Sequence, residues 1–146
     1  MKKRVFGFIV IVGITTALMA GGRFSRDDIK EVVTDSETHL MWQDNSDAAT
    51  VTKIWEDAID YCEALTLGGY TDWHLPNYNE LYSIGDRSRY NPAIDPTFHN
   101  VVTARYLSST SYIDNRFLCS VEFWYGLFNL APKSILYHVR CVRDNN

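Results

Sequence analysis

The chain has 146 residues, of which 46% are hydrophobic and 22% are charged, and its 14 basic and 18 acidic residues give a net charge of −4 at pH 7. A negative protein repels the phosphates of nucleic acid at long range, so composition argues against a nucleic-acid partner. The length allows one domain with a single hydrophobic core.

The first 20 residues have the order of a secretory signal peptide. A basic cluster at residues 2–4 precedes an apolar run at 5–19, and small residues follow at 20–22. The run of 15 residues is shorter than the roughly 20 that span a bilayer. We expect cleavage near Ala20, a periplasmic or extracellular location, and no membrane span afterwards. An uncleaved membrane anchor is the alternative.

Cleavage changes the charge of the remaining chain. Residues 1–20 hold three basic residues and no acidic ones, so residues 21–146 keep 11 basic and 18 acidic residues, a net charge of −7. The sequence predicts a flexible lead-in over residues 21–30 and one domain over residues 31–146. Within that domain, residues 31–42 predict a hairpin, because two short apolar runs flank a polar turn at 35–38.

Residues 43–50 are predicted to form a solvated polar loop. Asp44, Asn45 and Asp47 have the oxygen chemistry of a calcium loop, but the segment lacks the Gly and the distal Glu of an EF-hand. An amphipathic helix is predicted to follow, capped by Thr52. Its apolar residues recur at helical spacing, namely Trp55, Ala58, Ile59, Cys62 and Leu65.

The stretch 67–81 ends one helix and begins another. Gly68 and Gly69 suit the positive φ at which helices stop. Asn77 and Glu80 have the spacing of a capping box, which predicts a second helix over residues 78–85 with Leu81 and Ile84 facing inward. Residues 87–103 contain two X-Pro steps and predict an ordered, extended loop.

The last third predicts four strands, at residues 106–112, 117–123, 127–130 and 136–142. In the second of these, Phe117, Cys119, Val121 and Phe123 alternate with other residues and are expected on one buried face. The predicted fold is therefore α+β, with two helices packed on a small antiparallel sheet.

Several motifs resemble one bacterial family, the C-terminal domain of the Legionella collagen-like adhesin. The resemblance covers residues 32–143 and rests on motifs in the family's order: WEDA at 55–58, LGGYTDWHLP at 67–76, PAID at 92–95, YLSST at 106–110 and VRCVR at 139–143. It implies an exported domain with a C-type lectin-like outline. His39, His74 and Leu107 depart from the family pattern of Gly, Arg and Trp, so ligand contacts there are not carried over. The adhesin's affinity for sulfated glycans is not carried over either, because residues 21–146 carry a charge of −7.

The resemblance also bears on the three cysteines. An exported domain meets an oxidising environment, so one pair and one free thiol are expected. In the lectin-like group, a cysteine of the first helix is tied to one of the last strand, which predicts a Cys62–Cys141 disulfide and a free, buried Cys119. This bond would stabilise the fold by about 3–5 kcal/mol, less any strain. The rival pairing is Cys119–Cys141.

The residues that could carry catalysis lack a recognisable arrangement. No nucleophile-elbow motif frames Ser108, Ser109 or Ser111, and the four histidines show no zinc-ligand spacing. The formylglycine-generating enzymes, which share the lectin-like class, need a pair of active-site cysteines. Residues 75–77 have the proline and the amide of a calcium-dependent sugar site but lack the carboxylate or amide ligand that precedes the proline. We therefore expect no catalytic residues, no metal and no cofactor; an enzyme related to the formylglycine-generating group is the remoter alternative.

A binding or adhesion module of the bacterial envelope is the remaining interpretation. The candidate surface combines the loop 87–103 with the turn 124–126, where large aromatic residues sit beside a Gly. The candidate ligand-binding residues are Trp124, Tyr125, Tyr112 and Arg105. The alternative to an exposed Trp124 is that its side chain packs back onto the hydrophobic core. The expected partner is a glycan or an envelope or surface protein, and an oligomer is compatible with the sequence. The competing hypothesis is a structural envelope domain with no small-molecule ligand.

Overall fold

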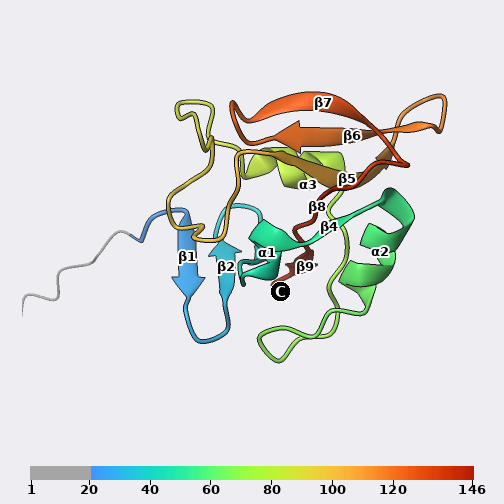
Figure 1. The fold of residues 1–146 in the computed structure, drawn as a ribbon. Coiled ribbons are helices and arrows are strands. Elements are labelled where there is room, and N and C mark those ends of the chain that lie inside the picture. Colours follow the sequence, from blue (N-terminus) through green and yellow to red (C-terminus); the bar gives the residue numbers. More distant parts are fainter. Residues whose placement is uncertain (1–20) are drawn as a thin grey trace, which may run out of the picture.

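The computed structural model describes residues 21–146, so the predicted signal peptide lies outside the described residues. Two sheets and three helices make up the fold (Figure 1). The first sheet has the order β1 (Phe24–Asp27), β2 (Val32–Asp35), β3 (Leu40–Gln43) and β9 (Val142–Asp144). The second has the order β4 (Thr52–Lys53), β8 (Tyr137–His138), β5 (Arg105–Ser111), β6 (Phe117–Glu122) and β7 (Leu127–Pro132).

Strand β1 lies in the segment that was predicted to be a flexible lead-in. All four of its residues pair with β2, from Phe24 opposite Asp35 to Asp27 opposite Val32. The guanidinium of Arg23 donates to both carboxylate oxygens of the buried Asp35, at 2.9 and 2.6 Å. The prediction is therefore wrong for residues 24–27. Local polarity suggested irregular chain, but sheet pairing and this ion pair order the segment.

The predicted last strand, 136–142, is two short strands in different sheets. Strand β8 pairs with β4 and meets β5 in parallel, whereas β9 pairs with β3. Between them, where the chain leaves one sheet for the other, lies the fully buried Arg140, which donates 2.9 Å to Asp44. The prediction of one antiparallel sheet is wrong in this respect. The other three predicted strands are confirmed, with shifted ends.

The helices are α1 (Asp47–Thr50), α2 (Trp55–Glu63) and α3 (Tyr78–Ser83). Thr52 does not cap α2, since it belongs to β4 and Ile54 occupies the N-cap position without a side-chain bond. The capping box of α3 is confirmed: Asn77 and Glu80 each accept from the other's backbone N–H at 2.9 Å. Gly68 and Gly69 have the predicted positive φ, 61° and 85°. None of these helices, all within residues 21–146, is long and apolar enough to cross a membrane.

The buried apolar residues form two clusters, and neighbouring strand residues belong to different ones. Leu107 and Leu118 lie in the cluster that contains the disulfide, whereas Tyr106 and Val121 lie in the other. Strand β6 is thus packed on both faces. The predicted single buried face is wrong for its first half, where Leu118 is buried and Cys119 is only half-buried. The alternation of polar and apolar residues along residues 117–123 indicates one buried face, and it does not show that the two buried clusters cover both faces of β6.

Residues 43–50, predicted as a solvated loop, are buried in part: Gln43, Asp44 and Ala48 are buried, whereas Ser46 and Thr50 are exposed. Gln43 and Asp44 are fully buried, and Tyr106 donates 2.8 Å to the carbonyl of Ala48 in α1. The carboxylate of Asp44 accepts from Arg140 and from the backbone N–H groups of His99 and Asn100, at 2.9–3.2 Å, and also pairs with Arg26. These distant donors replace water around the Asp44 carboxylate, so that this side chain can be fully buried.

The predicted Cys62–Cys141 disulfide is present. It joins α2 to the segment before β9 across 79 residues, and its Cα atoms are 5.5 Å apart. Cys119 remains free, as predicted. A mixed fold of helices and strands is confirmed, with three helices and two sheets in place of two helices and one sheet. The C-type lectin-like outline stays a prediction.

Candidate functional site

The loop 87–103 and the turn between β6 and β7 lie side by side. The backbone N–H of Asn91 donates 2.9 Å to the carbonyl of Trp124, and that of Ala93 donates 2.7 Å to the carbonyl of Phe123. The loop is closed at its base because the N–H of Asp86 donates to the carbonyl of Ala93 at 2.9 Å. These three bonds make the loop and the turn one continuous surface, here called the loop–turn surface (residues 86–93 and 123–126).

Gly126 is required where the turn meets the loop. Its φ is +69°, in the left-handed region that favours glycine, and a β-carbon there would lie 3.2 Å from the Cβ of Ala93. A side chain at this position would therefore strain the backbone and push the loop away. The sequence Trp-Tyr-Gly thus presents two aromatic rings on a turn that stays close to its neighbour.

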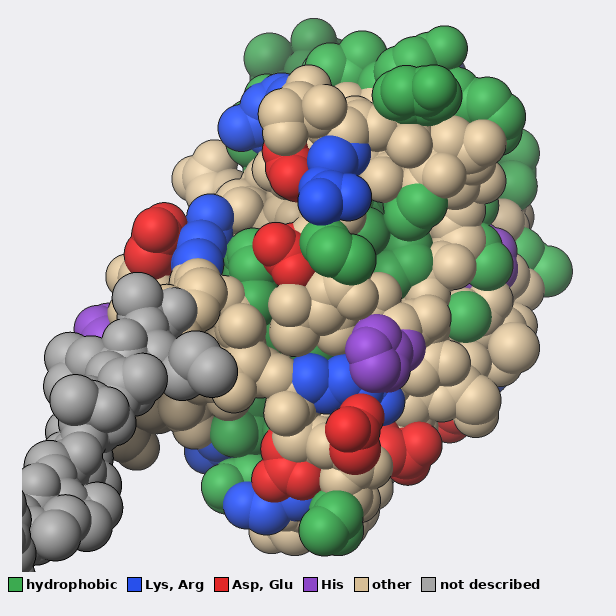
Figure 2. All heavy atoms as spheres, turned by 90° about the vertical axis from the view of Figure 1, so that its left-hand side faces the viewer, with side chains coloured by type: hydrophobic (Ala, Val, Ile, Leu, Met, Phe, Trp, Pro, Cys, Tyr) green, Lys and Arg blue, Asp and Glu red, His purple; other side chains and the backbone are tan. Residues whose placement is uncertain are grey.

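Three aromatic side chains project from the loop–turn surface. Trp124 is 39% exposed, Tyr125 is 58% exposed and Tyr90 is 73% exposed. The rings of Trp124 and Tyr125 are 6.2 Å apart between centroids and meet edge to face. Figure 2 shows hydrophobic side chains gathered along the top of the molecule, where Figure 1 places the β6–β7 turn. Trp124 belongs to neither buried cluster, contrary to the alternative that it packs onto the core.

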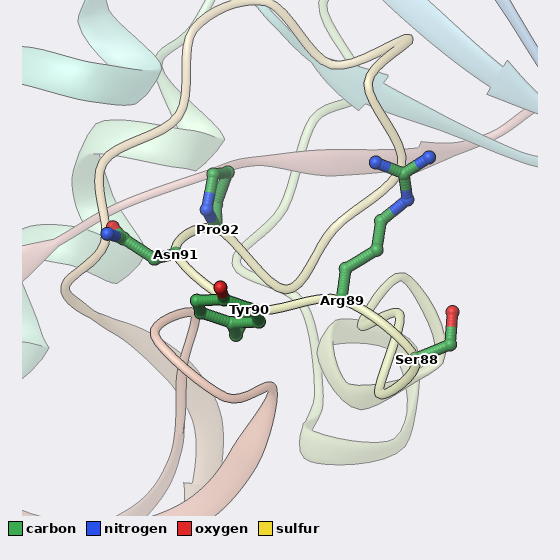
Figure 3. Close-up of a pocket in the computed structure, with 5 residues that line it drawn as sticks. All are labelled: Ser88, Arg89, Tyr90, Asn91 and Pro92. Atoms are coloured by element: carbon green, nitrogen blue, oxygen red, sulfur yellow. The ribbon is translucent and has the colours of Figure 1, made fainter.

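Polar groups of the loop surround a hollow of about 520 Å³ that opens to solvent. Residues 88–92 line it, and Figure 3 shows that they follow one another on a single loop, with the Arg89 side chain extending away from Asn91. Asp86 holds this loop by accepting from the hydroxyl of Ser88 at 2.6 Å and from Arg89 at 3.2 Å. The pKa of Asp86 is lowered, mainly by the bond from Ser88. The hollow therefore offers hydrogen-bonding groups next to exposed rings.

A second hollow of about 320 Å³ lies on the other side of Asp86 and is lined by residues 83–87 together with Arg23, Phe24 and Asp95. Arg87 places its guanidinium 4.3 Å from the ring centroid of Tyr82, on α3. Arg23 is already occupied by Asp35 and Glu37. Arg87 is consequently the cation of this hollow that no acidic group neutralises within residues 21–146.

The four predicted site residues do not form one site. Trp124 and Tyr125 share the loop–turn surface, whereas Tyr112 lies at the opposite end of the β5–β6 pair, in which Arg105 is opposite Glu122 and Ser111 is opposite Leu118. Arg105 is half-buried, with its guanidinium 5.4 Å from the ring of Tyr137 and a 3.3 Å bond to the carbonyl of Leu130. Their ligand-binding role stays a prediction.

Tyr90 and Arg87 are not among the four site residues that the sequence predicts. Tyr90 directly precedes the Asn91-Pro92 step, so a large aromatic in a polar, proline-containing loop was the available signal. Arg87 carried no such signal, because its stacking on Tyr82 depends on how α3 ends beside the loop.

Three of the groups that could carry catalysis, Ser108, Cys119 and His138, are buried or half-buried within the fold. Ser108 is buried in β5, and its hydroxyl donates to the carbonyl of Cys119. Burial raises the pKa of the Cys119 thiol, which disfavours the reactive thiolate, and burial lowers the pKa of His138. Within residues 21–146, no group of three or more His, Cys, Asp or Glu side chains could hold a metal ion. The expectation of a protein without catalysis stays a prediction.

Comparison with known families shows that residues 31–143 match a family model described as the Lcl C-terminal domain. The matched region runs from the residue before β2 into β9 and includes both cysteines of the disulfide. No curated protein matches the sequence.

Proposed function

The chain belongs to the Lcl C-terminal domain family, and we propose that it is an exported, non-enzymatic binding module that recognises a glycan through the loop–turn surface. The family is that of the terminal domain of a Legionella collagen-like adhesin, which indicates a surface or adhesion module. The Cys62–Cys141 disulfide supports export, because such bonds persist in oxidising compartments.

The placement of Trp124 and Tyr125 beside a polar hollow carries the proposal. Sugar rings bind to proteins by packing their C–H faces on aromatic rings while their hydroxyls exchange hydrogen bonds with polar groups at the edge. Trp124, Tyr125 and Tyr90 offer exposed rings, and Ser88 and Asn91 offer polar groups on the adjoining loop. Because Asp86 and the turn hold the loop in place, little conformational entropy is lost when a ligand binds.

The charge of the chain narrows the class of glycan. Residues 21–146 carry 18 acidic and 11 basic residues, and Arg89 next to the hollow is paired with Asp86. A sulfated polysaccharide would meet long-range repulsion, and Arg87 is the one cation within residues 86–93 and 123–126 that no acidic group neutralises. A neutral saccharide is therefore the proposed ligand.

A glycan array probed with the purified protein tests the proposal. Trp124→Ala and Tyr125→Ala should each weaken binding to any neutral glycan found by roughly 5–30-fold, which corresponds to the loss of about 1–2 kcal/mol. Both side chains are exposed, so the free energy of unfolding should change by less than about 0.5 kcal/mol. Tyr112→Ala is the matched control, because Tyr112 is an exposed tyrosine at the other end of the strands.

Three results would count against the proposal. Equal losses in the Tyr112 control would mean that the loop–turn surface is not the site. Unfolding of both turn variants would make Trp124 and Tyr125 structural residues. A soluble, folded protein that binds no glycan on the array would instead favour the structural envelope domain.

A further inference from the structure

We propose that strand β7 is an interface between two copies of this chain, which pair edge to edge and antiparallel. Strand β7 is the outer strand of the second sheet and lies along the top of the molecule in Figure 1. Its six residues pair with β6 without a break in register. On its other side, no strand within residues 21–146 pairs with it. An open strand edge of this kind is a template for another strand.

The other outer strands of the two sheets are protected in ways that β7 is not. Strand β1 includes the charged Arg26 and Asp27, β4 has only two residues, and β9 has three, of which two are charged. Strand β7 reads Leu-Phe-Asn-Leu-Ala-Pro, with no charged residue and a proline only at its end. Charges, proline and shortness are the devices that keep edges apart, so β7 is the least protected edge.

Exposed apolar side chains are concentrated around the same strand. Residues 127–136 hold four of the ten large hydrophobic residues that are exposed in residues 21–146, not counting Trp124 and Tyr125 of the loop–turn surface. Leu127 at the start of β7 is 52% exposed, and Leu136 after its end is 60% exposed. An apolar strip of this kind on a soluble protein marks a surface that another molecule covers.

The arrangement of these side chains selects a second copy in antiparallel orientation. Leu127 and Phe128 begin the strand, whereas Ile135 and Leu136 follow its end. An antiparallel pair of β7 strands has a two-fold axis at its middle, so the exposed start of one strand lies beside the exposed end of the other. The apolar groups at both ends are then covered at once. An unrelated extended peptide that pairs with β7 need not carry apolar residues at the positions that would cover both ends of the strand.

The six residues of β7 carry no charge, so pairing along this strand removes no charged side chain of β7 from water. Lys133, which directly follows the strand, is already held within the chain. Its Nζ donates 2.6 Å to Ser111 and to Asn115, and it lies 3.7 Å from the ring centroid of Trp55. Glu122, opposite Leu127 on β6, accepts from the side chain of Asn129 at 3.4 Å. The contact between two copies is therefore proposed to be made by the uncharged strand and the apolar residues at its ends.

Analytical ultracentrifugation tests this interface, with protein purified after expression of the whole chain and without any ligand. The expected result is a monomer–dimer equilibrium. Leu127→Lys and Leu136→Lys should each weaken the dimer by at least about tenfold, because each places an unpaired charge in an apolar contact that the dimer buries. Ile29→Lys is the matched control: Ile29 is 96% exposed and lies between β1 and β2, in the other sheet. It should leave the dimer unchanged.

Hydrogen exchange adds a readout that locates the contact. Raising the protein concentration should slow exchange of the backbone amides in residues 127–132 and leave the amides of β1 unaffected. Leu136 lies outside the strand, so its variant decides the matter if Leu127→Lys does not fold.

A monomer at every soluble concentration would overturn the proposal, even if β7 captured an extended peptide from another protein. A dimer that both lysine variants leave intact, or open-ended assemblies larger than a dimer, would overturn it too. Trp124 and Tyr125 lie outside β7, before its first residue. The glycan array and the ultracentrifugation experiment therefore test different residues, and either proposal can fail while the other holds.

Discussion

Asp44 is the residue on which several distant segments converge. Its carboxylate is fully buried and accepts from Arg140 at 2.9 Å and from the N–H groups of His99 and Asn100 at 2.9 and 3.2 Å. A buried carboxylate without such donors would be costly, since it has lost its hydration. Asp44 therefore holds the end of the loop 87–103 against the segment before β9.

We expect Asp44→Asn to lower the free energy of unfolding by about 3 kcal/mol, because it leaves the buried Arg140 without its counter-charge. Denaturant unfolding followed by circular dichroism measures the change. Asp57→Asn, on the exposed face of α2, should cost less than about 0.5 kcal/mol. Equal stability of the two variants would show that the Asp44 network adds nothing.

His74 is a pH-sensitive residue at the start of the stretch that leads to α3. Its Nε2 lies 3.4 Å from the Oε2 of Glu80, and the bond to Glu80 raises the pKa of His74 despite its partial burial. Asp72 and Asp144 add attraction for the protonated ring. Burial tends to raise the pKa of Glu80, but the bonds from His74 and Asn77 outweigh it and lower that pKa.

The raised pKa of His74 predicts a pH dependence of stability. Its contribution is complete below the ordinary value of 6.5 and is lost as the pH rises through the folded-state pKa. Because the pair is half-exposed, the loss should be below about 1 kcal/mol. Thermal unfolding between pH 5.5 and 8.5 measures it, and His74→Gln should flatten the curve. The idea fails if the variant keeps the same slope.

At the scale of elements, the fold is held by links between segments that are far apart in sequence. The disulfide ties α2 to the segment before β9, and the backbone N–H of Gln43 donates 3.0 Å to the carbonyl of Cys141. The side chain of Gln43 accepts from the N–H of Cys141 at 2.9 Å. Helix α2, β3 and the approach to β9 are therefore fixed to one another at Cys141.

We expect the double variant Cys62→Ser, Cys141→Ser to lose about 4 kcal/mol of stability, because the disulfide closes a long loop in the unfolded chain. Urea unfolding without reductant measures the loss. Cys119→Ser should cost about 1 kcal/mol or less, since that thiol is free. Non-reducing peptide mapping is the second check: a disulfide peptide that contains Cys119 would contradict the pairing.

At the scale of the whole molecule, two sheets share one chain that crosses between them twice. Strand β9 returns to the first sheet after β8 has joined the second. The two buried clusters lie against alternate residues of β5 and β6, so the central strands serve both. The loop–turn surface and the β7 edge remain open on this framework, at the top of the molecule in Figure 1.

Export is the prediction that concerns the entire chain. The basic, apolar and small-residue order of residues 2–22 predicts cleavage near Ala20. Mass spectrometry of the protein from the envelope fraction should find a chain that begins close to Gly21. An intact Met1 on that protein would contradict cleavage, and recovery only from the cytoplasm would contradict export.

The sequence by itself determined the features whose causes lie close together in the chain. Asn77 and Glu80 are three residues apart and cap α3 as predicted, and Gly68 and Gly69 take the positive φ that their lack of a side chain permits. The family motifs added the Cys62–Cys141 pair and the match over residues 31–143.

Only the tertiary structure decided the features whose causes lie far apart. Asp44 is buried because Arg140, 96 residues later, neutralises it; the same Arg140 separates β8 from β9. Strand β1 is ordered by its pairing with β2, and β7 is an edge because no later strand pairs beside it within the described chain. Burial and pairing are properties of the assembled fold, and a local pattern of polar and apolar residues does not contain the partner that each segment meets.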